Sequence, residues 1–322
     1  MATEFVTGGS GFIGGRLISR LVADGHTVRA LARSDKAAAA VEALGAEPVR
    51  GDLSDADSLA AGAAGAEVAY HCAAKAEQSR DWAAFVRANV DGTRAVVDAC
   101  RAAGVRRLVH VSSEAALMNG QPLVNVDESA PLQPDSRAPY PATKAAAEAL
   151  VTEANGDGLE TVVVRPRFVW GAGDTTLLPV LTEMVRAGKF AWIGGGRHRT
   201  DMTHVDNVVA GLVLAAERGK PGAVYFVTDG EPAVFRDFVG QLIETQGVAV
   251  PTRSIPIGLA MAVAKVGELL WRRGNPPLDQ FTVWVSALEC TIDIGKARAE
   301  LGYTPVRTRE EGLAELRAAT TG

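Results

Sequence analysis

Cysteine is scarce in this chain of 322 residues, and the few cysteines lie far apart. Cys72, Cys100 and Cys290 form neither a CxxC pair nor a cluster with histidine, so the sequence supports no zinc site and no disulfide framework. We therefore expect no bound metal. A reducing cytoplasm is the compartment that suits such unpaired thiols.

A long uninterrupted apolar run is also missing. The longest apolar stretch, residues 255–270, is broken by Lys265 and Glu268. It falls short of the roughly 20 apolar residues that a membrane span requires. We interpret it as a buried or amphipathic helix, and a membrane-associated enzyme resting on this helix is the alternative. The N-terminus has no basic segment followed by an apolar one, so we expect no export and a cytoplasmic location.

A large excess of one charge is absent as well. The net charge of −5 gives no support to nucleic acid or to an anionic membrane as a partner, and we expect neither. The sequence has no internal repeat. Its length is large for one compact core, which predicts one large domain with a smaller lobe.

What the first half does contain is a regular alternation of short β-branched runs and alanine-rich stretches. The expected strands are 4–6, 28–32, 48–50, 68–72, 108–112 and 161–165, and the expected helices are 12–23, 36–44, 57–61, 81–103 and 141–154. This order predicts an α/β protein with a Rossmann-type, doubly wound parallel sheet. In such sheets the ligand lies beyond the carboxyl ends of the strands.

After residue 165 the alternation weakens. Residues 171–174 and 194–196 are expected loops, residues 224–227 an expected strand of the main sheet, and the tail from residue 232 is mainly helical. We therefore predict a dinucleotide-binding domain and a smaller, discontinuous, mainly helical substrate lobe. The domain comprises residues 1–167 and roughly 204–229, and the lobe comprises residues 168–203 and 230–322.

A glycine-rich turn follows the first expected strand. Its glycines, Gly8, Gly11 and Gly14, are spaced three and three. A strand that turns on glycines into a helix places backbone N–H groups and the positive end of the helix against a pyrophosphate. Glycine is needed where the chain turns tightly and where the phosphate approaches the backbone. A glycine-rich turn without a ligand is the alternative.

Three further positions carry candidate catalytic groups. Tyr140 and Lys144 are four residues apart at the start of a helix and share a face, so the ammonium is expected to lower the tyrosine pKa; a surface pair is the alternative. Ser112 or Ser113, after the fifth strand, can polarise a carbonyl or cap a turn. Asn89 can hold a water beside Lys144, or its side chain can be satisfied by the backbone.

Together these segments resemble an extended short-chain dehydrogenase/reductase over nearly the full chain, most closely the branch of 3β-hydroxysteroid dehydrogenases and dihydroflavonol reductases. The matching segments are the glycine loop 7–14, the adenine-contacting Asp52-Leu53, residues 71–74, Asn89, the catalytic set Ser113, Tyr140 and Lys144, the pair Arg165-Pro166, and the His-Val-Asp run 204–206. The resemblance implies that Tyr140 relays the substrate proton and that Lys144 also holds the nicotinamide ribose. It also implies a homodimer through helices 81–103 and 141–154.

The end of the second strand distinguishes NAD from NADP, because an acid there accepts from the ribose and repels a 2′-phosphate. This chain has no acid at residues 30–32, and Arg33 follows directly. A guanidinium binds phosphate in bidentate fashion, so we predict that NADP is preferred, with NAD as the alternative cofactor and a solvent-facing arginine as the competing interpretation. The predicted cofactor contacts are Gly8, Ser10, Gly11, Phe12, Ile13, Arg33, Asp52, Leu53, Ala73, Ala74, Lys75, Tyr140, Lys144, Pro166 and Phe168.

The fold alone does not choose the reaction. Dehydratases similar to this family carry Thr-Asp-Glu where this chain has Ser113-Glu114-Ala115, and the missing second acid disfavours dehydration. Related epimerases place an arginine where this chain has Thr200. We therefore predict hydride transfer between nicotinamide and a ketone or secondary alcohol. A nucleotide-sugar 4-epimerase and a non-catalytic NADP-binding sensor are the alternatives.

Apolar residues of the smaller lobe suit an apolar, aromatic or steroid-like substrate, and ordinary core packing is the alternative. They are Trp192, residues 255–261, Trp271 and residues 281–284. In the reducing direction we expect Ser113 and Tyr140 to hydrogen-bond the carbonyl and Tyr140 to supply the proton. Lys144, with a water held by Asn89, would then restore that proton.

Overall fold

A seven-stranded parallel sheet forms the centre of the molecule, in a computed structural model that describes residues 2–270, 276 and 278–321. The strand order is β12-β7-β5-β4-β1-β2-β3, so the chain winds outward from β1 in both directions. The strands are β1 (Thr3–Thr7), β2 (Thr27–Ala32), β3 (Glu47–Arg50), β4 (Val68–His71), β5 (Arg107–Val111), β7 (Glu160–Pro166) and β12 (Val224–Val227). The predicted doubly wound parallel sheet is confirmed.

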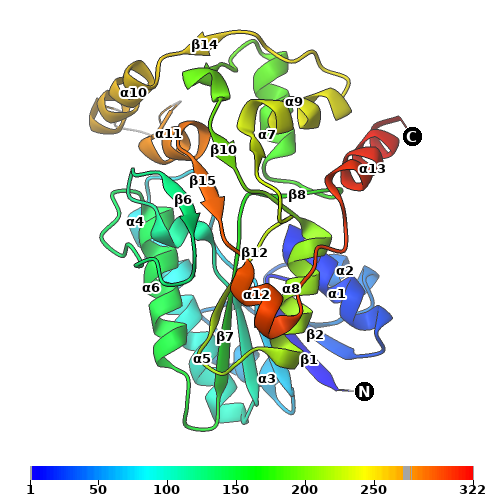
Figure 1. The fold of residues 1–322 in the computed structure, drawn as a ribbon. Coiled ribbons are helices and arrows are strands. Elements are labelled where there is room, and N and C mark those ends of the chain that lie inside the picture. The colour runs from blue at the N-terminus through cyan, green and yellow to red at the C-terminus, as the bar shows by residue number, and fades with distance from the viewer. Residues whose placement is uncertain (1, 271–275, 277, 322) are drawn as a thin grey trace.

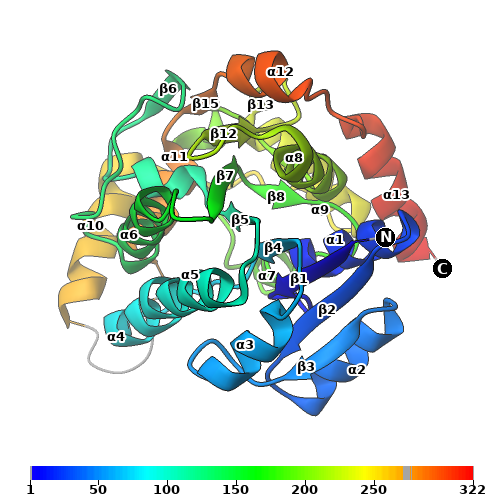
Figure 2. The same cartoon turned by 90° about the horizontal axis from the view of Figure 1, so that it is seen from below.

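Helices cover both faces of this sheet because both faces of its strands are apolar (Figure 2). One face packs on α3 (Ala56–Ala63), α5 (Gly92–Ala103) and α6 (Pro139–Glu153). The other face packs on α1 (Phe12–Ala23), α2 (Asp35–Ala43) and α8 (Val205–Arg218). The carboxyl ends of the strands therefore open on one edge, where the loops that carry the candidate site meet.

The helix expected at 81–103 is divided into three parts. It runs as α4 (Trp82–Phe85), a π-helical turn η1 (Val86–Asp91) and α5. In a π-helix each carbonyl accepts from the N–H five residues later, and single turns of this kind often occur at functional sites. Asn89 lies in this wide turn and is buried.

A smaller lobe lies above the sheet (Figure 1). Its largest sheet has the order β13-β10-β15-β6, and β6 comes from the part of the sequence that the predicted boundaries place in the dinucleotide-binding domain. The strands and short turns outside the main sheet are η2 (Glu114–Leu117), β6 (Leu123–Val126), β8 (Val169–Trp170), β9 (Trp192–Ile193), η3 (Gly194–Gly196), β10 (Arg199–Thr200), β11 (Thr203–His204), β13 (Ala233–Val234), β14 (Ser254–Ile255) and β15 (Cys290–Ile292). The other helices are α7 (Leu178–Arg186), α9 (Phe235–Thr245), α10 (Ile257–Leu270), α11 (Gln280–Ala287), α12 (Gly295–Leu301) and α13 (Arg309–Thr321).

Aromatic side chains fill the core of this lobe. Trp170, Trp192, Phe235 and Phe238 are buried together. Trp192 therefore follows the core-packing alternative, and Trp271 lies outside the described residues. Within the described part of the chain, no helix is both long and apolar enough to cross a membrane.

Candidate active site

The glycine loop leads from β1 into α1 and is shaped for close approach of a ligand. Gly8 has a φ of +74°, and a Cβ there would lie 2.6 Å from the backbone nitrogen of Ala73. A Cβ at Gly14 would lie 2.3 Å from the carbonyl oxygen of Gly8. Both positions therefore require glycine. No side chain caps the N-terminus of α1 at Gly11, and Ser10 and Gly11 are exposed, so the helix presents free N–H groups that fit a pyrophosphate.

The residues predicted for the adenosine end follow β2 and β3. Arg33 is exposed just beyond β2. Hydrogen bonds from Ser54, at 2.7 Å from its N–H and 2.6 Å from its hydroxyl, lower the pKa of the Asp52 carboxyl, and the charge of Arg33 lowers it further. Arg33 and Asp52 therefore lie close enough for their charges to interact. Leu53 packs against Gly92 and is partly buried.

Asn89 joins the loop after β4 to α6. Its amide oxygen accepts from the Lys75 N–H at 2.7 Å, and its amide nitrogen donates to the Lys75 carbonyl at 3.1 Å and to the Thr143 hydroxyl at 3.0 Å. Ala73 and Ala74 belong to the same loop, and Ala73 lies beside Gly8. The side chain of Asn89 thus bonds directly to backbone and to a helix residue, as in the second alternative that the sequence left open.

Tyr140 stands at the start of α6, close enough to Ser113 for this serine to influence its pKa. Burial, followed by the Glu114 carboxylate, raises the pKa of Tyr140 to about 12, against a smaller lowering by Ser113. The expectation that Lys144 lowers this pKa is wrong for this structure. The Lys144 ammonium is buried and donates to the Val111 carbonyl at 2.7 Å, and burial lowers its own pKa to about 8.

The two serines after β5 have different partners. Ser112 donates to Glu148 at 2.6 Å, and Glu148 is paired with the buried Arg165. Ser113 is the serine beside Tyr140, and its hydroxyl also donates to Glu114 at 2.7 Å. The structure therefore places Ser113, rather than Ser112, in the candidate catalytic set.

An ion pair between Glu114 and Arg167 lies directly behind Ser113. Both side chains are buried. One carboxylate oxygen of Glu114 accepts from Arg167 and the other accepts from Ser113, while Arg167 also donates to the Thr200 hydroxyl at 3.1 Å. Arg167 was not predicted from the sequence as a site residue. The signal for it was Glu114, an acid in an apolar segment that needs a cation when buried.

The chain after β7 leads from the sheet into the lobe. Pro166 is buried at the end of β7. Phe168 has a φ of +43°, and its ring lies edge-on to Phe235 and Phe238 at centroid distances of 5.9 and 6.1 Å. This ring, predicted to contact the cofactor, packs into the aromatic core of the lobe.

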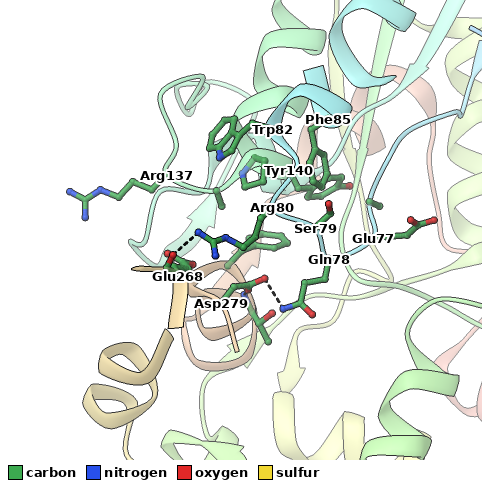
Figure 3. A pocket seen from close by; sticks show the side chains of 15 residues that line it. Glu77, Gln78, Ser79, Arg80, Trp82, Phe85, Arg137, Tyr140, Glu268 and Asp279 are labelled. Atoms are coloured by element: carbon green, nitrogen blue, oxygen red, sulfur yellow. Dashed lines mark hydrogen bonds between the residues drawn. The ribbon is translucent and has the colours of Figure 1, made fainter. Parts of the chain in front are cut away.

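A cavity of about 340 Å³ opens beside Tyr140 (Figure 3). Trp82, Phe85 and Phe281 supply its aromatic surface. The Phe281 ring lies 5.7 Å from that of Tyr140. Of the residues proposed from sequence for an apolar substrate, Phe281 therefore lines the cavity. Trp82 and Phe85 come from α4, within the predicted helix 81–103, and neither was predicted from the sequence as a site residue.

A cluster of His204, Asp206 and Glu315 has ligand atoms within 4.8 Å of one another. Asp206 is already paired with Arg16 at 2.5 Å and with Arg307 at 3.1 Å. Two guanidinium groups so close oppose a further cation. The His-Val-Asp run thus ties α8 to α1 and to the C-terminal segment.

Comparisons with known proteins agree with this geometry. The model of the 3-beta hydroxysteroid dehydrogenase/isomerase family matches residues 5–257. A 4-hydroxy-2-methyl-3-oxo-4-farnesyl-3,4-dihydroquinoline-1-oxide ketoreductase of Stigmatella aurantiaca is 50% identical over 319 residues, which cover 98% of this chain and 96% of the relative. A 2-alkyl-3-oxoalkanoate reductase of Stenotrophomonas maltophilia is 36% identical over 326 residues, 98% of both chains.

Solved structures share the fold. A dTDP-glucose 4,6-dehydratase double mutant of Streptomyces venezuelae, crystallised with NAD, has a TM-score of 0.78 at 24% identity, covering 98% of this chain and 95% of that one.

Proposed function

Because the chain belongs to the 3-beta hydroxysteroid dehydrogenase/isomerase family of extended short-chain dehydrogenases/reductases, we propose that it is an NADP(H)-dependent ketoreductase for ketones that carry a long apolar group. Membership of this family implies that the protein is a nicotinamide-dependent oxidoreductase. The preference for NADP, the reducing direction and the substrate class are our proposal. The observation that carries it is the phenol of Tyr140, which lines a cavity with aromatic walls.

The reducing direction is supported by the two relatives, whose names describe a ketoreductase and a reductase. Tyr140 suits this direction as a proton donor, because its phenol, like that of an unperturbed tyrosine, is protonated at neutral pH. Such a group is suited to donate a proton to an oxygen that gains negative charge, as a carbonyl oxygen does during reduction. Ser113 lies beside the phenol, and its hydroxyl is held by Glu114, which is in turn paired with Arg167.

The cofactor, when bound, supplies the hydride. The residues that would hold it are the glycine loop, which offers free N–H groups at α1, and Arg33 with Asp52, which follow the carboxyl ends of β2 and β3 at the same edge of the sheet. Lys144, a buried residue of α6, brings a positive charge to the carboxyl end of β5, where it donates to the Val111 carbonyl. Arg33 supports NADP because no acid at the end of β2 opposes a 2′-phosphate.

The substrate class rests on the cavity and on two relatives. The names of both relatives describe ketones that bear farnesyl or alkyl groups. Trp82, Phe85 and Phe281 give this chain's cavity apolar walls that suit such groups.

The surroundings of Glu114 weigh against dehydration. Elimination needs an acid that is free to donate, whereas both carboxylate oxygens of Glu114 are engaged by Arg167 and Ser113. The second acid of the dehydratases is Ala115 here. Thr200, where related epimerases carry an arginine, is bonded to Arg167.

A Tyr140→Phe variant tests the chemistry. We expect NADPH consumption with alkyl-substituted 3-oxo acids and with hydroxylated aryl ketones to fall by at least about a hundredfold, because the proton donor is removed. NADPH affinity, followed by fluorescence titration, should change little. A Phe281→Leu variant serves as the control, since it alters the cavity and keeps the phenol. Turnover in Tyr140→Phe equal to that of the parent enzyme would refute the assignment.

An Arg33→Ala variant tests the cofactor. We expect kcat/KM for NADPH to fall by about tenfold to a hundredfold while that for NADH changes little, because one charge-assisted contact to phosphate is lost. Arg20→Ala is the matched control, an exposed arginine on α1 paired with Asp24. An unchanged ratio of the two cofactors in Arg33→Ala would rule out this role.

A further inference from the structure

Arg50 ends β3 directly beside the residue that ends β2. The two strands are parallel, and in their register Ala32 is paired with Arg50. Side chains alternate between the two faces along a strand, so these paired residues point to the same face of the sheet. The helix α2 packs on that face, next to the edge strand β3 (Figure 2). Arg50 therefore lies next to the strand end where an acid would contact the ribose of NAD.

The guanidinium of Arg50 is held by an acid of the neighbouring helix. One of its nitrogens lies 2.7 Å from a carboxylate oxygen of Asp35, in the first turn of α2. The side chain of Asp35 is 99% exposed and that of Arg50 is 54% exposed. An ion pair so open to water contributes little free energy. An anion with a larger charge can therefore displace the carboxylate.

The charge of a 2′-phosphate exceeds the charge that Arg33 alone can neutralise. A phosphate monoester carries about 1.5 to 2 negative charges at pH 7. Arg33 carries a single positive charge, and that charge also interacts with the carboxylate of Asp52. A second cation beside Ala32 would balance the phosphate, and Arg50 is the arginine that the strand register places there.

We propose that Arg50 is the second cation of the 2′-phosphate site, and that Asp35 holds its guanidinium until the phosphate displaces the carboxylate. This inference rests on the proposed preference for NADP. Arg33 and Arg50 stand at the ends of neighbouring strands, and a guanidinium binds phosphate oxygens in bidentate fashion. Asp35 competes for Arg50 and repels the phosphate, so it weakens the preference for NADP. This exposed ion pair thus tunes the choice between the two cofactors.

Calorimetric titration with adenosine 2′,5′-bisphosphate and with adenosine 5′-monophosphate tests the proposal without turnover. The two ligands differ in the 2′-phosphate alone, so the ratio of their dissociation constants reports on this group. The variants are Arg50→Met, Asp35→Asn and the double variant. The matched controls are Arg20→Met and Asp24→Asn, from an exposed pair whose nitrogen and oxygen lie 2.6 Å apart. They change the net charge equally, at the end of α1 opposite the glycine loop.

We expect the parent protein to bind the bisphosphate more tightly than the monophosphate. Arg50→Met should reduce this preference by about tenfold, because a charge-assisted contact to phosphate is lost. Asp35→Asn should increase it by about threefold to fivefold, and the increase should vanish in the double variant, because Asp35 acts through Arg50. The controls should change it by less than about twofold, because salt screens exposed charges far from the phosphate.

An Arg50→Met protein that keeps the preference of the parent overturns the inference. So does a gain from Asp35→Asn that persists in the double variant, because Asp35 would then act without Arg50. A parent that binds both ligands equally overturns the inference together with the proposed preference for NADP. Loss of the preference in Arg33→Ala but not in Arg50→Met retains the preference for NADP and overturns the role of Arg50 alone. The test of the chemistry by Tyr140→Phe is independent of all these outcomes.

Discussion

The buried ion pair between Glu114 and Arg167 offers a direct test of how the site is built. Replacing Arg167 by methionine removes the cation and keeps most of the side-chain volume. Glu114 then stays buried as a charge with Ser113 as its remaining partner among the contacts described above. A buried charge that loses its partner destabilises a protein, because the free-energy cost of removing the charge from water is no longer offset by an ion pair.

The size of the effect follows from this burial. Breaking a buried pair by removing one partner costs about 3–5 kcal/mol in the free energy of unfolding. For a protein larger than 250 residues, 1 kcal/mol corresponds to roughly 2 °C in the melting temperature, so we expect a fall of about 6–10 °C. Arg106→Met is the control. Its guanidinium is exposed and paired with the exposed carboxylates of Glu67 and Glu160, so its loss should cost less than about 1 kcal/mol.

The double variant Arg167→Met with Glu114→Gln separates the charge from the packing. It removes both charges, so it should regain about 1–3 kcal/mol relative to Arg167→Met alone. Calorimetry in a fixed buffer, with all four proteins of the cycle, measures these differences. A double variant no more stable than Arg167→Met would refute the electrostatic reasoning, as would an Arg167→Met protein within about 1 kcal/mol of the parent.

Three further outcomes are expected. In Glu114→Gln, loss of the negative charge should lower the pKa of Tyr140, so the pH–rate profile of alcohol oxidation should move to lower pH, and an unmoved profile would contradict the assignment. In Lys144→Met, the cost of a buried ammonium is removed, so unfolding at pH 7 should require about 1–3 kcal/mol more. The folded pKa of Lys144 is about 8 against an ordinary 10.5, so this gain should shrink as pH rises from 8 to 10.5, and denaturant titrations that show a constant gain would disprove the charge argument. In Gly8→Ala, a methyl group 2.6 Å from the Ala73 nitrogen and a φ of +74° should cost about 1–3 kcal/mol of stability and weaken cofactor binding, and calorimetry with a cofactor titration checks both.

Several parts of this structure could be predicted from the sequence because they depend on local patterns. β-branched runs and alanine-rich stretches gave the strands of the main sheet within one residue at each end. The four-residue spacing of Tyr140 and Lys144 placed both on one helix, α6. The glycine loop was recognisable because only glycine fits at Gly8 and Gly14.

The remaining features depend on contacts between distant segments. Arg167 meets Glu114 across 53 residues of sequence, and no spacing rule connects them. The π-helical turn differs from an α-helix by its wider winding, which the apolar periodicity of residues 81–103 does not resolve. The direction in which the pKa of Tyr140 shifts could not be inferred from Lys144, its neighbour on the helix. Burial and the carboxylate of Glu114, which comes from another segment, determine it.

The strand β6 has a consequence for the modularity of this enzyme. It leaves the main sheet between β5 and α6, pairs with β15 near the other end of the chain, and the chain then returns to the main sheet. The smaller lobe therefore cannot be exchanged between relatives as a single contiguous cassette, because one of its strands is encoded inside the other unit. Recombination that grafts a new lobe after residue 167 would pair the new β15 with a β6 from a different protein. New substrate preferences in this architecture are therefore expected to arise by point substitution rather than by exchange of domains.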